Sequence, residues 1–163
     1  MNEQKIFPFY NGPFCQWYPS EFTDEDGITY DCAEQYMMAQ KALMFGDDET
    51  YEKIMASDSP GEQKALGRLV KGFDVESWEE DARQIVYQGN LYKFSQSGYL
   101  WCYLKDTGDK ILVEASPTDT IWGVGLSEID PRVFDKSQWL GRNWLGDCLM
   151  RVREALKEMK YRP

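Results

Sequence analysis

The chain has 163 residues, 42% of them hydrophobic, which suits one domain with a sizeable core, so we expect a single domain over residues 1–163. Eighteen Lys and Arg against 28 Asp and Glu give a net charge of -10, which excludes a broad, sequence-independent affinity for DNA or an anionic membrane but leaves room for a local basic pocket. No histidine is present, so acid–base chemistry near neutral pH falls to a carboxylate, a tyrosine, a lysine or a thiol with a shifted pKa.

The four cysteines are widely spaced and form no C-x-x-C pair. Without histidine they are poor ligands for a transition metal, so we expect no metal and no other cofactor, and reduced thiols as in a cytosol. The start of the chain has no apolar run of signal-peptide length, and no later segment approaches about 18 apolar residues. We therefore expect a cytoplasmic protein with no membrane partner and no obligate protein partner.

The first thirty residues are rich in aromatics, Gly and Pro, which predicts short strands and turns, with DEDG as a hairpin turn. Helical patterns follow. The first predicted helix has Asp31 as its cap and ends at Gly46, and a second covers residues 47–57. A third has Ser59 as its cap and Pro60 as its first residue.

A long helical tract follows Ser77, another potential cap. Gly89 and Gly98 weaken its helical pattern, so we expect one or two helices there. Residues 110–116 (KILVEAS) predict a short buried strand, and the segment after it carries loop signals. Residues 143–160 predict a final helix with leucines at helical spacing. The expected fold is α+β and mainly helical, with a small sheet built from segments far apart in the sequence.

Glu34 stands out because a helix would place it on one stripe with Met37, Met38 and Lys41. Two interpretations are open. In an apolar cleft, loss of water would raise the pKa of Glu34 and suit it to proton transfer. Alternatively, Glu34 is an ordinary surface acid near a helix start.

A polar and aromatic loop comes directly after the predicted strand and contains Asp119, Trp122 and Gly123. Such loops often carry catalytic groups because the strand fixes their base while their side chains stay accessible. The alternative is a structural turn in which Asp119 caps backbone amides and Trp122 packs on the core.

The stretch LGRNWLGDC precedes the last predicted helix. Glycines on both sides of Asn143 would let backbone amides at the helix start approach an anion such as phosphate, and Arg142 would add a charge. The alternative is a tight turn in which Gly146 serves helix packing. The spacing is neither that of a Walker loop nor that of a Rossmann fingerprint, so neither ATP nor NAD binding by those folds is supported.

Four motifs together resemble the NADAR, or YbiA-like, family. They are AEQYMMAQKALMF, ALGRLVKGFDVESWEEDARQIVYQGNLYKF, LVEASPTDTIWGVG and WLGRNWLGDCLMRVREAL, which occur in the order and spacing of that family. The N-terminal segment also looks like the opening of the family. The match covers about residues 6–157, and four motifs in order are far more specific than any single one.

The resemblance implies a mainly helical α+β domain with N-glycosidase activity. Family members cleave phosphorylated ribosylamino-pyrimidines of the early riboflavin pathway, and others remove ADP-ribose from guanine in DNA. The resemblance assigns importance for activity to Glu34, Trp78 and Asp119. Gln35 stands where the family often has a histidine, so that histidine is dispensable here or its role has moved.

The chemistry of such a reaction fits these residues. Hydrolysis of an N-riboside passes through an oxocarbenium-like state, which a carboxylate can stabilise while another directs water. We expect Glu34 to be the base that directs water and Asp119 to face the ribose hydroxyls or the cation. Trp78 would stack on the base or line the site. All three are predicted to converge on one cleft.

Three cations are candidates for binding phosphate: Lys41, Arg68 and Lys93. Their alternative is solvated charge on helices, and this alternative is strongest for Lys93. Lys41 has a second possible role as a partner of Glu34, which would lower the pKa of that acid instead of raising it.

The expected partner is a small nucleotide-like substrate or ADP-ribosylated guanine in nucleic acid. A rival hypothesis is a module that binds ADP-ribose or a nucleotide without cleaving it, which an exposed Glu34 far from Asp119 would favour. Another is a partner-recognition domain, since seven Met and 24 aromatic residues could form an adhesive surface.

Overall fold

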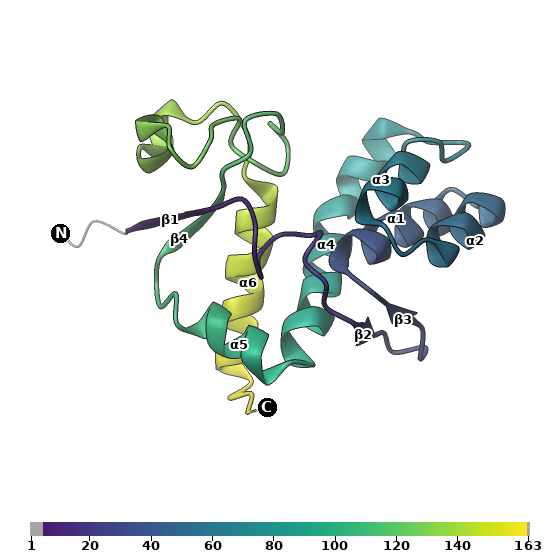
Figure 1. Ribbon diagram of the computed structural model, residues 1–163, viewed down its shortest axis with the longest axis horizontal. Helices are drawn as coiled ribbons and strands as arrows, with labels where there is room; N and C mark the ends of the chain where they lie inside the picture. The colour runs from purple at the N-terminus through teal and green to yellow at the C-terminus, as the bar shows by residue number, and fades with distance from the viewer. Residues whose placement is uncertain (1–4, 163) are drawn as a thin grey trace. The chain divides into compact units, whose positions relative to one another are not determined.

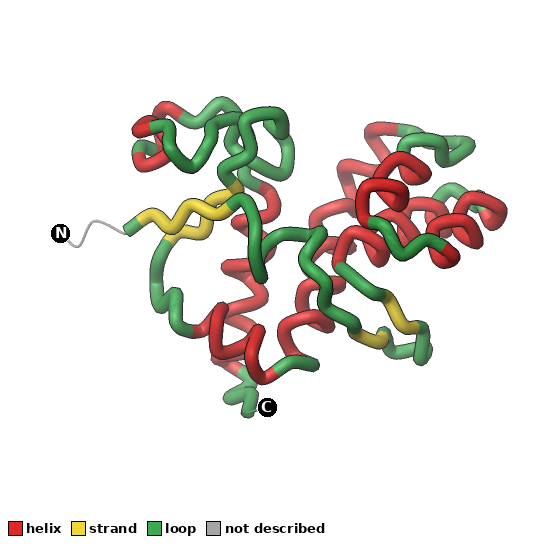
Figure 2. Tube along the Cα trace, in the orientation of Figure 1, coloured by secondary structure: helices red, strands yellow, loops and turns green. Residues whose placement is uncertain are grey.

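The computed structural model describes residues 5–162 and divides into two compact units, one of residues 16–96 and one of residues 5–15 with 97–162. Each unit is described by itself. The described residues form six α-helices and two small two-stranded sheets (Figure 1). Helices and loops make up most of the chain (Figure 2), which confirms the expected α+β, mainly helical fold class. A single domain over residues 1–163 stays a prediction.

The unit of residues 16–96 begins with a hairpin and continues with four helices. Strand β2 (Phe22–Thr23) pairs antiparallel with β3 (Thr29–Tyr30), as the DEDG turn predicted. Gly27 of this turn has a φ of 81°, which glycine adopts without strain. The helices are α1 (Ala33–Met44), α2 (Asp48–Ala56), α3 (Pro60–Gly67) and α4 (Val75–Ser95).

Short polar side chains cap α3 and α4. Ser59 accepts a hydrogen bond from the amide of Glu62, and Pro60 is the first residue of α3, as predicted. The prediction of Ser77 as a cap was wrong. Asp74 caps α4, and its carboxylate accepts bonds from both the amide and the hydroxyl of Ser77.

The cap predicted for α1 was also wrong. Its N-cap residue is Cys32, not Asp31, and Cys32 makes no side-chain capping bond. The amide of Glu34 donates instead to the carbonyl oxygen of Gln16, at 3.0 Å. A backbone segment distant in sequence therefore does what a capping side chain usually does.

Small residues allow the helices of this unit to approach closely. Gly89 of α4 lies against the ring of Tyr36 in α1, and Gly67 of α3 lies against the thioether of Met38. A Cβ atom at Gly89 would come within 2.5 Å of Tyr36 Cδ1, which a rigid ring cannot avoid by changing rotamer. These glycines fix how α1 packs against α3 and α4.

Gly89→Ala is expected to destabilise the protein although alanine favours helix by about 1 kcal/mol. Overpacking a core costs about 1–3 kcal/mol, so the net loss in the free energy of unfolding should be about 1 kcal/mol. Thermal unfolding would show this as a Tm about 3 °C lower. Gly61→Ala is the matched control, since its nearest contact would lie at an ordinary 3.6 Å. A Tm for Gly89→Ala at or above that of wild type would contradict this packing.

The cap of α2 is Asp47, a buried acid with several hydrogen bonds. Its carboxylate accepts bonds from the amide of Lys71 at 2.8 Å and from the hydroxyl and the amide of Thr50 at 2.6 and 3.1 Å. These bonds, with that of Lys71 first, lower the pKa of Asp47 to about 2.

The lowered pKa predicts a pH-dependent contribution of Asp47 to stability. A depressed folded-state pKa stabilises the protein above the unfolded value of 3.8, and this contribution is lost as pH falls towards 2. Asp47→Asn should therefore have a lower Tm than wild type at pH 7, and the difference should shrink by pH 3. Thermal unfolding at both pH values checks this, with Asp58→Asn at an exposed site as control. A difference in Tm between wild type and Asp47→Asn that does not change with pH would contradict this prediction.

The other unit joins distant parts of the chain in a parallel pair of strands. Strand β1 (Ile6–Phe9) pairs with β4 (Ile111–Glu114), which confirms that segments far apart in sequence form a sheet. Helices α5 (Gly98–Lys105) and α6 (Trp144–Glu158) complete the unit, and the long loop before α6 contains two short 3-10 helices. The helical tract predicted after Ser77 thus forms two helices, α4 and α5.

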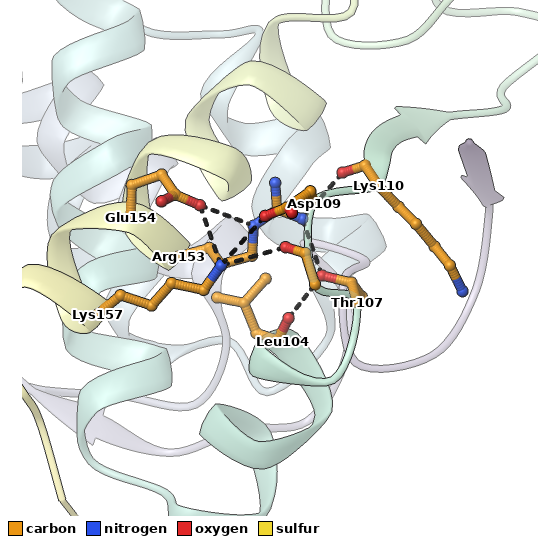
Figure 3. Close-up of polar contacts among 8 residues, drawn as sticks. Leu104, Thr107, Asp109, Lys110, Arg153, Glu154 and Lys157 are labelled. Atoms are coloured by element: carbon orange, nitrogen blue, oxygen red, sulfur yellow. Dashed lines mark hydrogen bonds and ion pairs between the residues drawn. The ribbon is translucent and has the colours of Figure 1, made fainter. Parts of the chain in front are cut away.

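A polar cluster ties α6 to the turn before β4 (Figure 3). Arg153 is 4% exposed and donates to Thr107 Oγ1 and to the carbonyl oxygen of Lys110, each at 2.9 Å. Thr107 Oγ1 in turn donates to the carbonyl oxygen of Leu104 in α5. The buried guanidinium is therefore itself hydrogen-bonded, to one side-chain oxygen and one backbone oxygen. None of the helices in residues 5–162 has the length and apolarity to cross a membrane.

Candidate active site

Glu34 is the second residue of α1 and is only 6% exposed. Its neighbours Ala33, Met37 and Met38 are buried too. The interpretation of Glu34 as a surface acid was therefore wrong, and its position in an apolar cleft stays a prediction. A raised pKa for Glu34 stays a prediction.

Three other titratable groups at the start of this helix stay protonated near neutral pH. Burial raises the pKa of Tyr30 and of Tyr36 above the usual tyrosine value. Burial also raises the pKa of the Cys32 thiol to about 11. A thiolate or tyrosinate base is thereby disfavoured here, and a role of Glu34 as proton acceptor stays a prediction.

Lys41 interacts with three of the other predicted residues of this unit, Glu34, Arg68 and Trp78. Its Nζ lies 4.3 Å from the ring centroid of Phe73 and 5.7 Å from that of Trp78. Burial lowers the pKa of Lys41, the Glu34 carboxylate raises it, and the Arg68 guanidinium lowers it again. A carboxylate, two cations and two aromatic rings thus influence one another on this side of α1.

Phe73 was missed by the sequence analysis. It lies in the loop between α3 and α4, where no periodic pattern could connect it with Lys41. Its ring packs edge to face on Phe45, with centroids 5.4 Å apart. The ring is still 44% exposed, so it can contact a ligand.

Lys93 is not a solvated surface cation. Its side chain is 1% exposed, and its Nζ lies 5.1 Å from the ring centroid of Phe94 and 5.8 Å from that of Tyr18. The alternative that appeared strongest for this residue was therefore wrong. Its role in binding phosphate stays a prediction.

Gln35, which replaces a histidine common in the resembled family, has a structural role here. Its Nε2 donates to the carbonyl oxygens of Ile54 and Ser57, both at 3.2 Å. Its Oε1 accepts the amide of Asp31 at 2.8 Å. The side chain therefore joins the start of α1 to the end of α2.

Asp119 is held by its own loop in the other unit. Its Oδ1 accepts the amides of Ile121 at 2.9 Å and Trp122 at 2.8 Å, so the predicted alternative of a capping role is confirmed. Both bonds reach Oδ1. A catalytic role for Oδ2 stays a prediction and is compatible with this turn.

Aromatic and cationic side chains lie beside this turn. Trp122 is half-buried and packs edge to face on Trp144, with ring centroids 5.6 Å apart. The guanidinium of Arg142, which is exposed, lies 5.1 Å from the Trp144 ring centroid. Trp122 therefore packs on a second half-buried tryptophan, the first residue of α6, and whether it also packs on the core stays a prediction.

The phosphate site predicted at the start of α6 is contradicted by the backbone. The amides of Asn143, Trp144 and Leu145 donate to the carbonyl oxygens of residues 121–123, at 3.1 to 3.2 Å. The amides that would have received an anion are thus used to attach the loop to the helix. The alternative, a tight turn at this point, is correct.

The side chain of Asn143 is also committed to the backbone, which corrects its assignment to direct substrate contact. It is 1% exposed, accepts the amide of Glu114 at 3.0 Å and donates to the carbonyl oxygen of Leu112 at 2.9 Å. Gly146 lies against the same Leu112 carbonyl, so its packing role is confirmed. A Cβ at Gly123 would lie 2.9 Å from the Glu114 carbonyl oxygen, so this glycine too allows close approach.

Residues 7–157 match the family described as NADAR domain. The chain belongs to this family. The N-glycosidase of Acanthamoeba polyphaga mimivirus is 43% identical to this NADAR domain over 145 residues, covering 86% of the chain and 85% of the viral protein. An N-glycosidase of Nostoc punctiforme is 34% identical over 126 residues, covering 77% of the chain and 74% of the relative.

Longer relatives and a solved structure agree with this assignment. A riboflavin biosynthesis protein of Vibrio vulnificus is 30% identical over 161 residues, which are 96% of the chain but 40% of that protein. The NMR structure of the E. coli protein YbiA is similar with a TM-score of 0.79 and 28% identity, covering 98% of the chain and 89% of YbiA. The resemblance to the NADAR, or YbiA-like, family is therefore confirmed.

The predicted site residues of this NADAR domain fall into two sets. Glu34, Lys41, Arg68, Trp78 and Lys93 belong to the unit of residues 16–96. The other predicted residues belong to the second unit: Asp119, Trp122, Gly123, Arg142 and Asn143. Convergence of the two sets on one cleft stays a prediction.

Proposed function

We propose that this chain is an N-glycosidase that hydrolyses the N-ribosyl bond of a phosphorylated, nucleotide-like compound. Membership of the NADAR family supports this activity, as does a sequence identity of 43% and 34% to two N-glycosidases over most of the chain. The observation that carries the proposal is the buried carboxylate of Glu34, held on the same helix as a partly buried lysine with two aromatic rings. Such a group of side chains suits a reaction on a charged nucleoside.

In the proposed reaction, Glu34 accepts a proton from water while the water oxygen forms a bond to the anomeric carbon. The bond between that carbon and the base nitrogen breaks, its electron pair leaves with the nitrogen, and the nitrogen takes up a proton. The products are a free base and a sugar phosphate. The carboxylate of Asp119 would stabilise the positive charge that develops on the sugar.

Binding roles follow from the side chains around Lys41. The Lys41 ammonium interacts electrostatically with both the Glu34 carboxylate and the Arg68 guanidinium, and the two cations suit a substrate phosphate. The rings of Trp78 and Phe73 suit stacking against the base. A bound phosphate would be the counter-ion of Lys41, so Glu34 would not have to neutralise that charge.

A phosphorylated ribosylamino-pyrimidine is the substrate class that we favour. Relatives named for riboflavin biosynthesis contain a segment similar to almost the whole chain. The net charge of -10 also disfavours extended contact with duplex DNA. ADP-ribosylated guanine is the second candidate, because a flipped or single-stranded base could still enter a local pocket.

A substrate panel tests the proposal. The protein is incubated with a ribosylamino-pyrimidine phosphate, with ADP-ribosylated guanine in single-stranded DNA and with free ADP-ribose, and the products are separated by chromatography. We expect free base and sugar phosphate from the first compound. Tight binding in calorimetry with every compound recovered intact would instead support a non-catalytic module that binds ADP-ribose or a nucleotide.

A further inference from the structure

Two buried amide side chains, Gln16 and Asn90, form a pair beside α1. Asn90 of α4 is 0% exposed, and its Nδ2 donates to Gln16 Oε1 and to the carbonyl oxygen of Val86, both at 2.9 Å. Gln16 is 9% exposed. The pair therefore joins the segment before β2 to the middle of α4.

The pair leaves one donor and one acceptor unsatisfied. Within residues 5–162, Gln16 Nε2 and Asn90 Oδ1 are buried and have no backbone or side-chain hydrogen-bond partner. Exchanging the amide atoms of Asn90 would place its oxygen against two other oxygens, so the orientation of Asn90 is fixed by its partners. Exchanging those of Gln16 would place two NH₂ groups against each other. Two buried amides with unmet hydrogen-bonding capacity are a poor way to stabilise a core, and such groups are rare in native proteins.

The backbone of Gln16 connects the pair to the proposed catalytic acid. Its carbonyl oxygen accepts the amide of Glu34 at 3.0 Å. The N-cap residue Cys32 makes no side-chain capping bond, so this carbonyl helps to anchor the first turn of α1. The side chain of the same Gln16 is anchored on α4, the helix that carries Trp78. Movement of Gln16 would therefore be transmitted directly to the Glu34 backbone.

We propose that Gln16 and Asn90 are positioning residues that hold Glu34 in place for hydrolysis, acting through the Gln16 carbonyl. This inference rests on the proposed catalytic role of Glu34. A displacement of about 1 Å can slow an enzyme about a hundredfold, so an anchor one hydrogen bond from the base has a large effect on rate. The two unsatisfied atoms lower the stability of the fold, and this loss accompanies the placement of Glu34.

The test compares stability with turnover in Gln16→Met, Asn90→Leu and the double variant. Each single variant leaves the other amide with a lost partner, so its Tm should fall by several degrees. The double variant replaces both amides by apolar groups of similar size, so its Tm should return to the wild-type value or exceed it. Its kcat should still be about 10- to 100-fold lower, with KM within about threefold of wild type. A double variant with both Tm and kcat of wild type would overturn the inference.

Hydrogen exchange gives a readout that does not depend on activity. The amide of Glu34 should exchange faster with solvent in the double variant, while amides in the middle of α6 keep their protection. If the wild-type protein cleaves none of the compounds, the proposed function fails, and the exchange rate of Glu34 alone decides the positioning role. Unchanged protection of this amide in the double variant would refute that role.

A second variant covers the case in which the double variant does not fold. Gln16→Glu keeps an oxygen that accepts from Asn90 Nδ2, whereas Gln16→Met does not. Protection of the Glu34 amide should therefore survive in Gln16→Glu and be lost in Gln16→Met. Equal protection in the two variants would count against the pair as an anchor.

Discussion

Glu34→Gln is expected to slow turnover at least about a hundredfold while the protein stays folded and still binds its substrate. Glutamine keeps the size of the buried side chain but cannot accept a proton from water. Because the new side chain fills the same space, the packing of α1 should stay intact. Steady-state kinetics gives kcat, calorimetry gives the affinity for substrate, and thermal unfolding confirms that the variant is folded.

Glu80→Gln is the matched control for this change. It removes a carboxylate from an exposed position of α4 and alters the net charge by the same amount. Its kcat should equal that of wild type. If the two variants turned over equally fast, Glu34 would be a buried structural acid and the proposed reaction would need another base.

Asp119→Asn should lower kcat by about a hundredfold or more, through loss of negative charge beside the developing cation. The turn itself should survive, because an asparagine Oδ1 can still accept the amides of Ile121 and Trp122. The substitution therefore separates the charge of this side chain from its capping role. Kinetics with the preferred substrate measures the effect of the lost charge. Near-UV circular dichroism of the neighbouring tryptophans shows whether the capped turn is intact.

Asp135→Asn provides a control with similar local geometry. Asp135 also accepts a backbone amide two residues ahead, that of Ser137 at 3.0 Å, and lies in an exposed part of the same unit. It should have wild-type kcat. If Asp119→Asn were equally active, Asp119 would be a capping residue only, and the expectation that it shares a cleft with Glu34 would lose its support.

The sequence predicted most elements of the fold because their signals are local. Ser59 followed by Pro60 marks the start of α3, and the DEDG turn marks the hairpin. Caps were less certain where several polar residues compete. Asp74 and Ser77 both suit a cap, and the structure uses the earlier one, with the later as its donor.

Contacts made by distant segments could not be predicted in this way. The carbonyl of Gln16 replaces a capping side chain at α1, and nothing near Asp31 in the sequence indicates it. The burial of Lys93 has a similar origin, because the ring of Tyr18 comes from another part of the chain. A lysine in a helix is exposed far more often than buried, so its pattern alone predicted the wrong environment.

The candidate site shows the same limit. Glu34, Lys41 and Trp78 were predicted from motifs, and the structure places the rings of Phe73 and Trp78 around Lys41. The glycines near Asn143 suggest an anion site, but Gly141 lies against Thr120 and Gly123 of the preceding loop, and Gly146 lies against the Leu112 carbonyl of β4. Glycine allows close approach of any backbone, whether to a ligand or to a neighbouring strand.

The most direct test of the central claim is the mass balance of one reaction. Wild-type protein and Glu34→Gln are incubated with the ribosylamino-pyrimidine phosphate, and free base and sugar phosphate are quantified together over time. The account predicts that the two products appear in equal amounts with wild type and that their formation nearly stops with Glu34→Gln. Intact substrate with wild type, or equal product release by the two proteins, would contradict it.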